Sequence, residues 1–151
     1  ALVAALVLGY GGATPLAAPV AVDYRTTSGY GQRIDPFNGR PTFHAGLDLA
    51  AFERAPVVAT SPGTVSFAGV RSGYGNVVEI DHGHGFKTRY AHLRDIQVQR
   101  GDRVAIGQRV GSMGSTGRST ATHLHYEVWF RGRAVDPVSF LRAGRHVHEQ
   151  G

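Results

Sequence analysis

Histidine and aspartate stand in this sequence at spacings that could bring several metal ligands together. The segment STATHLHYEVWF (119–130) holds His123 and His125 one residue apart. In a β-strand, residues i and i+2 project from the same face and start about 7 Å apart, close enough to converge on one metal ion. The H-x-H spacing by itself permits both histidines, one of them or neither as a ligand.

A second spacing of interest joins His44 and Asp48 in the segment FHAGLD (43–48). Gly46 between them indicates an extended or looped segment, and residues i and i+4 share a face when the chain is extended. The alternative for Asp48 is a turn residue that caps local N–H groups. His92, in the segment RYAHL, is a further candidate, although it could be a half-buried histidine bonded to the backbone.

These candidates suffice for a catalytic metal site. The chain contains no cysteine, so a bound metal must rest on His, Asp, Glu or backbone groups. His44, Asp48 and one histidine of the H-x-H pair would supply three nitrogen and oxygen ligands and leave a fourth zinc position open for water. Such an open site is typical of hydrolytic chemistry, with the remaining histidines free for acid-base work. More than one choice of three ligands among these residues would leave histidines for acid-base work.

Two other H-x-H pairs show that the spacing is not diagnostic. His82 and His84 lie in the glycine-rich segment DHGHG, where we expect a turn whose side chains point in different directions. His146 and His148 lie in the polar segment GRHVHEQG, which we expect to be a surface tail without a rigid frame.

The charge balance favours an anionic partner. The chain carries 16 Lys and Arg residues against 11 Asp and Glu residues, a formal net charge of +5. Nucleic acid, a lipid surface and an acidic polymer such as a cell wall would each suit this charge. RNA-binding sheets interleave exposed aromatic and basic residues on one face, and no segment shows that pattern, so we expect no nucleic-acid partner.

Short β-prone segments separated by turn dipeptides predict an all-β fold, mainly antiparallel. We expect hairpins within residues 56–70, 75–93, 100–114 and 122–137, with turns at Pro62-Gly63, at Asp81 to Gly83 and at Arg131-Gly132. In the last segment the alternation places Leu124, Tyr126, Val128 and Phe130 on the core face and His123, His125, Glu127 and Trp129 on the other. We expect Glu127 to form a salt bridge at the rim.

The ends of the chain differ from its centre in composition. Residues 1–22 are rich in Ala, Gly and Pro and predict an arm or linker without regular structure, too short in its apolar part to span a membrane. Asp136, Pro137 and Gly144 predict one short C-terminal helix, with an N-cap, a first-turn proline and a stop. We therefore expect an arm at 1–22, a domain at 23–143 and a polar tail at 144–151.

The ordered motifs resemble the lysostaphin/LytM-type zinc metallo-endopeptidases, which cut peptide cross-links in bacterial peptidoglycan. The resemblance runs through most of the chain, in five segments: TSGYGQRIDPFNGRPTFHAGLDLAA, PVVATSPGTVSFAG, GYGNVVEIDHGHGFKTRYAHL, GDRVAIGQRVGSMGSTGRST and HLHYEVWFRGRAVDPVSFL. It implies an antiparallel sheet crossed by a substrate groove, with one zinc ion at its floor.

The resemblance also implies a division of roles among the candidates. The H-x-x-x-D motif falls on His44 and Asp48, and the second histidine of the H-x-H motif on His125, which gives three zinc ligands. His92 and His123 match family histidines that act on water or on the oxyanion; we favour His123 as base and His92 as oxyanion stabiliser. Ala121-Thr122 replaces the Gly-Pro that commonly precedes the H-x-H motif, which could change the aim of His123.

The function predicted in this way is zinc-dependent hydrolysis of peptidoglycan stem-peptide cross-links by a monomer in the periplasm or outside the cell, without stable membrane insertion of this segment. The alternative is a non-catalytic module of the same family that regulates another cell-wall hydrolase. Such members have typically lost metal ligands, whereas all five positions are present here.

Overall fold

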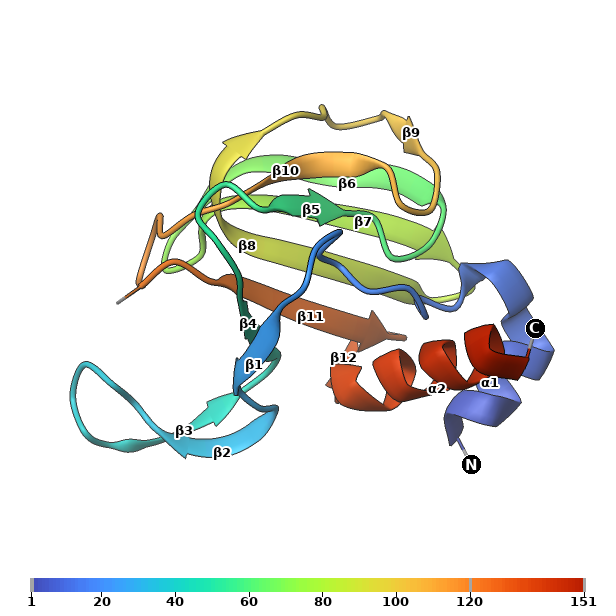
Figure 1. Ribbon diagram of the computed structural model, residues 1–151, viewed down its shortest axis with the longest axis horizontal. Helices are drawn as coiled ribbons and strands as arrows, with labels where there is room; N and C mark the ends of the chain where they lie inside the picture. The colour runs from blue at the N-terminus through green and yellow to red at the C-terminus, as the bar shows by residue number, and fades with distance from the viewer. Residues whose placement is uncertain (1, 120, 151) are drawn as a thin grey trace.

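The computed structural model describes residues 2–119 and 121–150, and most of them lie in antiparallel strands (Figure 1). The elements in chain order are α1 (Leu2–Tyr10), the 3-10 turn η1 (Gly11–Ala13), β1 (Arg25–Ser28), β2 (Gly31–Ile34), β3 (Pro41–His44), β4 (Leu47–Ala50), β5 (Pro56–Val58), β6 (Gly63–Arg71), β7 (Gly75–Gly83), β8 (Phe86–Ile96), β9 (Arg103–Val104), β10 (Arg109–Met113), β11 (Leu124–Phe130), β12 (Arg133–Val135) and α2 (Pro137–Gln150). The predicted fold class, a mainly antiparallel sheet with a C-terminal helix, is confirmed.

One large sheet forms the body of the molecule. Its strand order is β1-β4-β11-β8-β7-β6-β9, with β12 beside β11, and β10 paired with both β8 and β5. Strands β2 and β3 form a separate two-stranded sheet that projects from the body near β1 and β4 (Figure 1). The metal-site candidates therefore lie where this small hairpin joins the main sheet.

Two of the four expected hairpins are present, and both use two-residue turns. Strands β7 and β8 turn at His84-Gly85, slightly later than expected, and β11 and β12 turn at Arg131-Gly132. All four turn residues have positive φ, between 49° and 88°, as type I′ turns require. His82 therefore belongs to β7 rather than to the turn, and it is buried.

The expected hairpins at 56–70 and 100–114 are wrong. Strand β5 pairs with β10 instead of β6, and β9 pairs with β6 instead of β10. Between β5 and β6, the buried hydroxyl of Thr60 bonds the phenols of Tyr90 and Tyr126, which holds this connection against the core instead of leaving it as an exposed hairpin turn.

The N-terminal segment contains a helix that was not expected. Residues 2–10 are Ala, Leu and Val for the most part, and the helix propensity of Ala and Leu accounts for α1. Leu6 from this helix and Val20 from the following segment belong to the core cluster, and Val20 bridges to Val57 of β5. The expectation of an irregular arm was therefore wrong for residues 2–10, while the domain boundary at residue 22 stays a prediction.

The C-terminal helix is longer than expected. Helix α2 continues through Gly144 to Gln150, and Phe140 and Leu141 bury their side chains in the core. A side chain at Gly144 would clash with the carbonyl of Leu16, so this glycine permits a close approach of the N-terminal segment and does not end the helix. The backbone of the expected tail is thus helical up to Gln150. The side chains of His146 and His148 lie outside the described residues. No helix within 2–119 and 121–150 is long and apolar enough to cross a membrane.

Candidate metal centre

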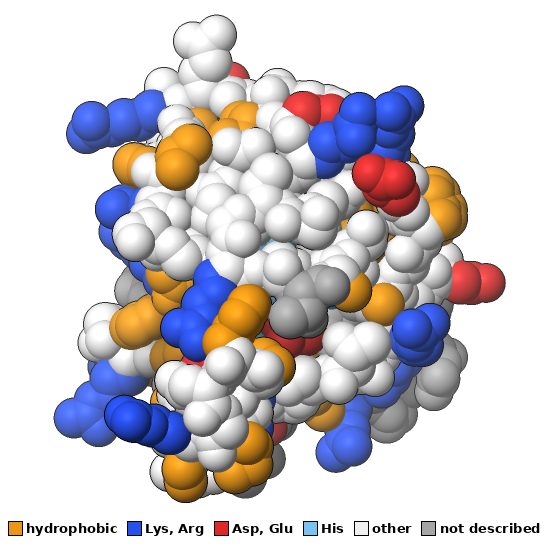
Figure 2. Space-filling view, turned by 90° about the vertical axis from the view of Figure 1, so that its left-hand side faces the viewer, with side chains coloured by type: hydrophobic (Ala, Val, Ile, Leu, Met, Phe, Trp, Pro, Cys, Tyr) orange, Lys and Arg blue, Asp and Glu red, His pale blue; other side chains and the backbone are white. Residues whose placement is uncertain are grey.

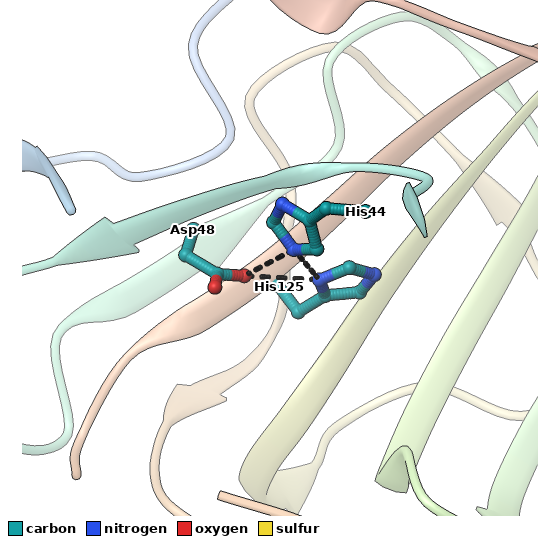
Figure 3. Close-up of side chains that lie close together, drawn as sticks. All are labelled: His44, Asp48 and His125. Carbon is teal, nitrogen blue, oxygen red and sulfur yellow. Dashed lines mark hydrogen bonds and ion pairs between the residues drawn. The ribbon is translucent and has the colours of Figure 1, made fainter. Parts of the chain in front are cut away.

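Three strands bring His44, Asp48 and His125 together. His44 ends β3, Asp48 lies in β4, and the register of β4 with β11 places His125 opposite Asp48. Gly46 makes the turn between β3 and β4 possible, because a Cβ there would stand 2.5 Å from the Tyr126 carbonyl and 2.9 Å from Cε1 of His125. Figure 3 shows the three side chains pointing toward one another.

The three groups meet around one point, and all are buried. Asp48 Oδ1 lies 3.2 Å from His44 Nε2 and 2.9 Å from His125 Nδ1, and the two nitrogens are 3.1 Å apart. Such a group of two imidazoles and one carboxylate could hold a metal ion.

Hydrogen bonds on the far side of each ring leave the inward nitrogens available as ligands. His44 Nδ1 donates to the Gly29 carbonyl at 2.7 Å, and His125 Nε2 donates to Glu127 Oε2 at 2.7 Å. With a metal ion bound, the proton of each ring would stay on that outer nitrogen, so that His44 Nε2 and His125 Nδ1 could direct their lone pairs at the ion. This is how second-shell partners set the tautomer of metal-binding histidines.

Glu127 is the centre of this second shell and not a rim residue, so the rim expectation was wrong. Its side chain is 0% exposed. Oε2 accepts from His125 Nε2 and the Tyr74 hydroxyl, and Oε1 accepts from Arg89 at 2.9 Å and from Trp129 Nε1 at 2.7 Å. The alternation correctly placed Glu127 on the face of His125, but it did not predict the burial of Glu127, because Arg89 comes from β8 and Tyr74 from the turn between β6 and β7.

The surroundings shift the pKa values of Asp48 and His125 in opposite directions. Burial raises the pKa of Asp48, but hydrogen bonds from His125 and His44 outweigh it and hold the pKa well below its ordinary value. Burial lowers the pKa of His125, but its bonds to Asp48 and Glu127 raise it above the ordinary value. Asp48 is therefore ionised, as a metal ligand must be.

Arg33 contacts the same carboxylate from the projecting hairpin. Its guanidinium lies 3.2 Å from Asp48 Oδ2 and 2.9 Å from the Ser28 hydroxyl. Because Arg33 uses Oδ2, Oδ1 remains directed at the two histidines. Sequence reasoning missed Arg33, and spacing offers no signal for it, since β2 reaches Asp48 only through the fold.

His92 and His123 lie side by side at the edge of the three-residue cluster. Their ring centroids are 4.8 Å apart, and His123 Nε2 lies 3.7 Å from Asp48 Oδ1. Nδ1 of His92 donates to the Thr116 carbonyl and Nδ1 of His123 to the Ala121 carbonyl, and neither Nε2 atom has a hydrogen-bond partner among the described residues. The backbone at His92 is left-handed, with φ of 61°, a strained conformation that often marks functional sites.

Burial, together with the neighbouring rings of His123 and His125, lowers the pKa of His92 to about 4 against the opposing effect of its bond to Thr116. His92 is therefore a neutral imidazole near pH 7.

A small cavity of about 90 Å³ opens over these histidines. Arg118, in the loop between β10 and β11, spans it to the tip of the β2–β3 hairpin: its guanidinium pairs with Asp35 at 2.8 Å and lies 4.3 Å above the ring of Phe37. The entrance is thus narrow and bounded by two loops. Among the described residues coloured in Figure 2, Lys and Arg side chains are spread around the face, with apolar and acidic ones between them.

The remaining described histidines lie elsewhere. His82 bonds the Pro62 carbonyl and the Thr88 hydroxyl inside the core, and His84 is exposed in its turn against Tyr10. Neither belongs to the metal-site cluster, in line with the expectation that H-x-H spacing is not diagnostic.

An antiparallel sheet that gathers two histidines, one carboxylate and two further histidines defines a metallohydrolase type of site. The comparison with known proteins gives the family: the chain belongs to peptidase family M23, whose sequence model matches residues 42–137.

The relatives include a DD-carboxypeptidase/endopeptidase Mpg of Neisseria meningitidis serogroup B, 44% identical over 76% of this chain and 26% of its own length. Among solved structures, the catalytic domain of lysostaphin from Staphylococcus simulans is 36% identical to this chain, with a TM-score of 0.72. A zinc-containing peptidase from Vibrio cholerae is 42% identical, with a TM-score of 0.71. The alignments cover 79% and 78% of this chain, and 92% and 37% of the other chains. The chain spans about a quarter of the length of the first curated relatives.

Proposed function

We propose that this domain is a zinc-dependent endopeptidase that hydrolyses peptide cross-links of bacterial peptidoglycan. The observation that carries the proposal is the convergence of His44 Nε2, Asp48 Oδ1 and His125 Nδ1 on one point, where each atom could serve as a metal ligand. The names of the relatives, a DD-endopeptidase activity among them, support the reaction and the substrate class.

The donor set fits zinc. Ligands at zinc's usual distance in a tetrahedron stand roughly 3.3 Å apart. The three contacts observed here, 2.9 to 3.2 Å, need only a small expansion to reach that separation. With His44, Asp48 and His125 as protein ligands, a fourth position is left for water or substrate. When bound, zinc supplies a Lewis acid that polarises a carbonyl and makes water acidic near neutral pH.

The other two histidines handle protons. We propose that His123 accepts the proton of the attacking water at Nε2 and passes it to the leaving amine, because this atom has no hydrogen-bond partner among the described residues and faces Asp48 Oδ1 from 3.7 Å. As the oxyanion of the tetrahedral intermediate develops, His92 takes up a proton from solvent at Nε2 and donates a hydrogen bond to the oxyanion. The neutral ring is favoured at rest, and the negative charge that develops on the oxyanion raises the pKa of His92 during the reaction.

The proposed substrate also gives the location and partners. Peptidoglycan lies outside the cytoplasmic membrane, so we propose that the domain works in the cell envelope, in the periplasm or outside the cell. Its partner there is the stem peptide, and we propose that the domain acts as a monomer.

Digestion of purified sacculi, with mass spectrometry of the products and a zinc assay, tests the proposal. The protein is compared with His125→Ala and His123→Ala. We expect His125→Ala to lose both zinc and activity, and His123→Ala to keep zinc and lose activity. Loss of zinc from His123→Ala would show that the division of roles is wrong, and equal cleavage by all three proteins would exclude the enzyme. Zinc binding without any cleavage would support the alternative, a regulatory module.

A further inference from the structure

A cavity of about 570 Å³ lies at the other end of the sheet face that carries the metal-site cluster. Its lining includes Trp129 of β11, Lys87 and Arg89 of β8, Glu79 and Asp81 of β7, and Arg131 of the β11–β12 turn. None of the roles proposed above uses this cavity.

The strand register places the cavity on the same face as the site. His125, Glu127 and Trp129 alternate along β11, and Glu127 and Trp129 stand opposite Arg89 and Lys87 of β8. Trp129 lies four residues from His125, or about 13 Å along the strand. An extended peptide of four residues covers the same distance.

A row of neighbouring planar groups connects the metal-site cluster with the cavity. The ring of Tyr74 lies 5.8 Å from the ring of His125, and the guanidinium of Arg89 lies 4.8 Å from the centre of the Tyr74 ring and 5.6 Å from that of Trp129. Arg89 is fixed in this row by ion pairs to Glu127 and Glu79, both at 2.9 Å. The floor between the metal-site cluster and the cavity is therefore rigid.

The far end of the cavity is also held in place. The two type I′ turns that border it are joined by the N–H of Arg131, which donates to the Gly85 carbonyl at 2.8 Å. A preformed site binds with less loss of conformational entropy than a mobile one.

The charges in the cavity favour an anion. Its lining carries three cations and two carboxylates. Glu79 is neutralised by Arg71 and Arg89, each at 2.9 Å, and Asp81 Oδ1 accepts the N–H of Gly83. Lys87 is exposed, and although the β7–β8 register places Asp81 opposite it, Lys87 forms no ion pair with Asp81 or with any other described residue. Its ammonium group is thus available to an incoming carboxylate.

We propose that this cavity is a second substrate-binding site, which holds a carboxylate-bearing part of the stem peptide about four residues from the scissile bond. Lys87 pairs with the carboxylate, and the half-buried ring of Trp129 packs against the aliphatic part of the peptide. This proposal rests on the proposed function, because it assumes that the peptide cut at the metal site extends along β11. The lining of the cavity carries one more positive than negative side chain, which favours an anionic peptide over an uncharged glycan as the occupant.

Trp129 is the one tryptophan of the chain, so its emission reports on the cavity directly. The probes are an un-cross-linked stem tetrapeptide, the same peptide with its carboxylates amidated, and an uncharged oligosaccharide of N-acetyl sugars. We expect a saturable change of emission with the tetrapeptide, weaker binding of the amidated peptide and no saturation with the oligosaccharide. Lys87→Ala should weaken binding of the tetrapeptide about two- to fivefold and leave the amidated peptide unaffected.

Arg100→Ala is the matched control, since it removes one exposed positive charge outside the cavity and should leave both affinities unchanged. Equal binding of the two peptides, an unchanged affinity of Lys87→Ala, or saturation by the oligosaccharide in place of the tetrapeptide would overturn the proposal. Cleavage of sacculi without any emission response would refute the second site and leave the proposed function standing. An emission response by a protein that cleaves no sacculi would uphold the site as a peptide-binding site and refute the enzyme.

Discussion

The substitution Glu127→Gln tests whether the buried carboxylate sets the ligand atom of His125. Both oxygens of Glu127 accept hydrogen bonds from two donors each, and an amide has only one oxygen. The introduced NH2 group must therefore face one of the two donor pairs. Arg89 and Trp129 can only donate, whereas the Tyr74 hydroxyl and His125 Nε2 can also accept.

The expected outcome follows from this asymmetry. The amide NH2 turns toward Tyr74 and His125, and His125 Nε2 becomes an acceptor. A neutral His125 then carries its proton on Nδ1, the atom that faces His44 and Asp48. Because a protonated nitrogen cannot bind a metal, that proton must be displaced at the cost of the second-shell bond.

We expect zinc affinity to fall about 10- to 100-fold, which corresponds to about 1.4 to 2.8 kcal/mol. Competition with a chromophoric chelator measures this directly and does not depend on catalysis. Glu79→Gln is the control: it also weakens a contact of Arg89, but Glu79 forms no bond with His125. Wild-type affinity in Glu127→Gln, or an equal loss in Glu79→Gln, would refute the reasoning.

Three further predictions concern the frame of the site. Gly46→Ala should lower the free energy of unfolding by about 1 to 3 kcal/mol in denaturant titrations, because its Cβ would press on Tyr126 and His125; unchanged unfolding would contradict this. Arg118→Ala should speed chymotryptic cleavage after Phe37 without moving the midpoint of global unfolding, since it frees the hairpin tip; equal cleavage rates would show that this contact does not hold the loop. Burial lowers the pKa of His82 below its ordinary 6.5, so the unfolded chain takes up a proton that the fold excludes, and stability should decrease as the pH falls below about 6.5. His82→Gln should flatten this dependence in urea titrations at pH 7 and pH 5, and parallel curves for the two proteins would count against it.

Local chemistry explains where the sequence was informative about the fold. The alternation in residues 124–130 depends only on the two-residue period of a strand, and Leu124, Tyr126 and Val128 are indeed buried. The turn at Arg131-Gly132 and the start of α2 at Pro137 also follow from neighbouring residues. Where a local signal had two meanings, it misled: Gly144 suggested a helix stop but serves a close approach of the chain to Leu16.

The sequence by itself determined the antiparallel class, the candidate site residues and the face of β11 on which His125 lies, because these depend on residue types and on the short period of a strand. Only the tertiary structure decided which nitrogen of each histidine faces inward, that Glu127 is buried, and that β5 pairs with β10. These features depend on partners far apart in the chain, such as Gly29 for His44 and Arg89 for Glu127. Long-range register and burial bring those partners together, and no spacing within a single segment encodes them.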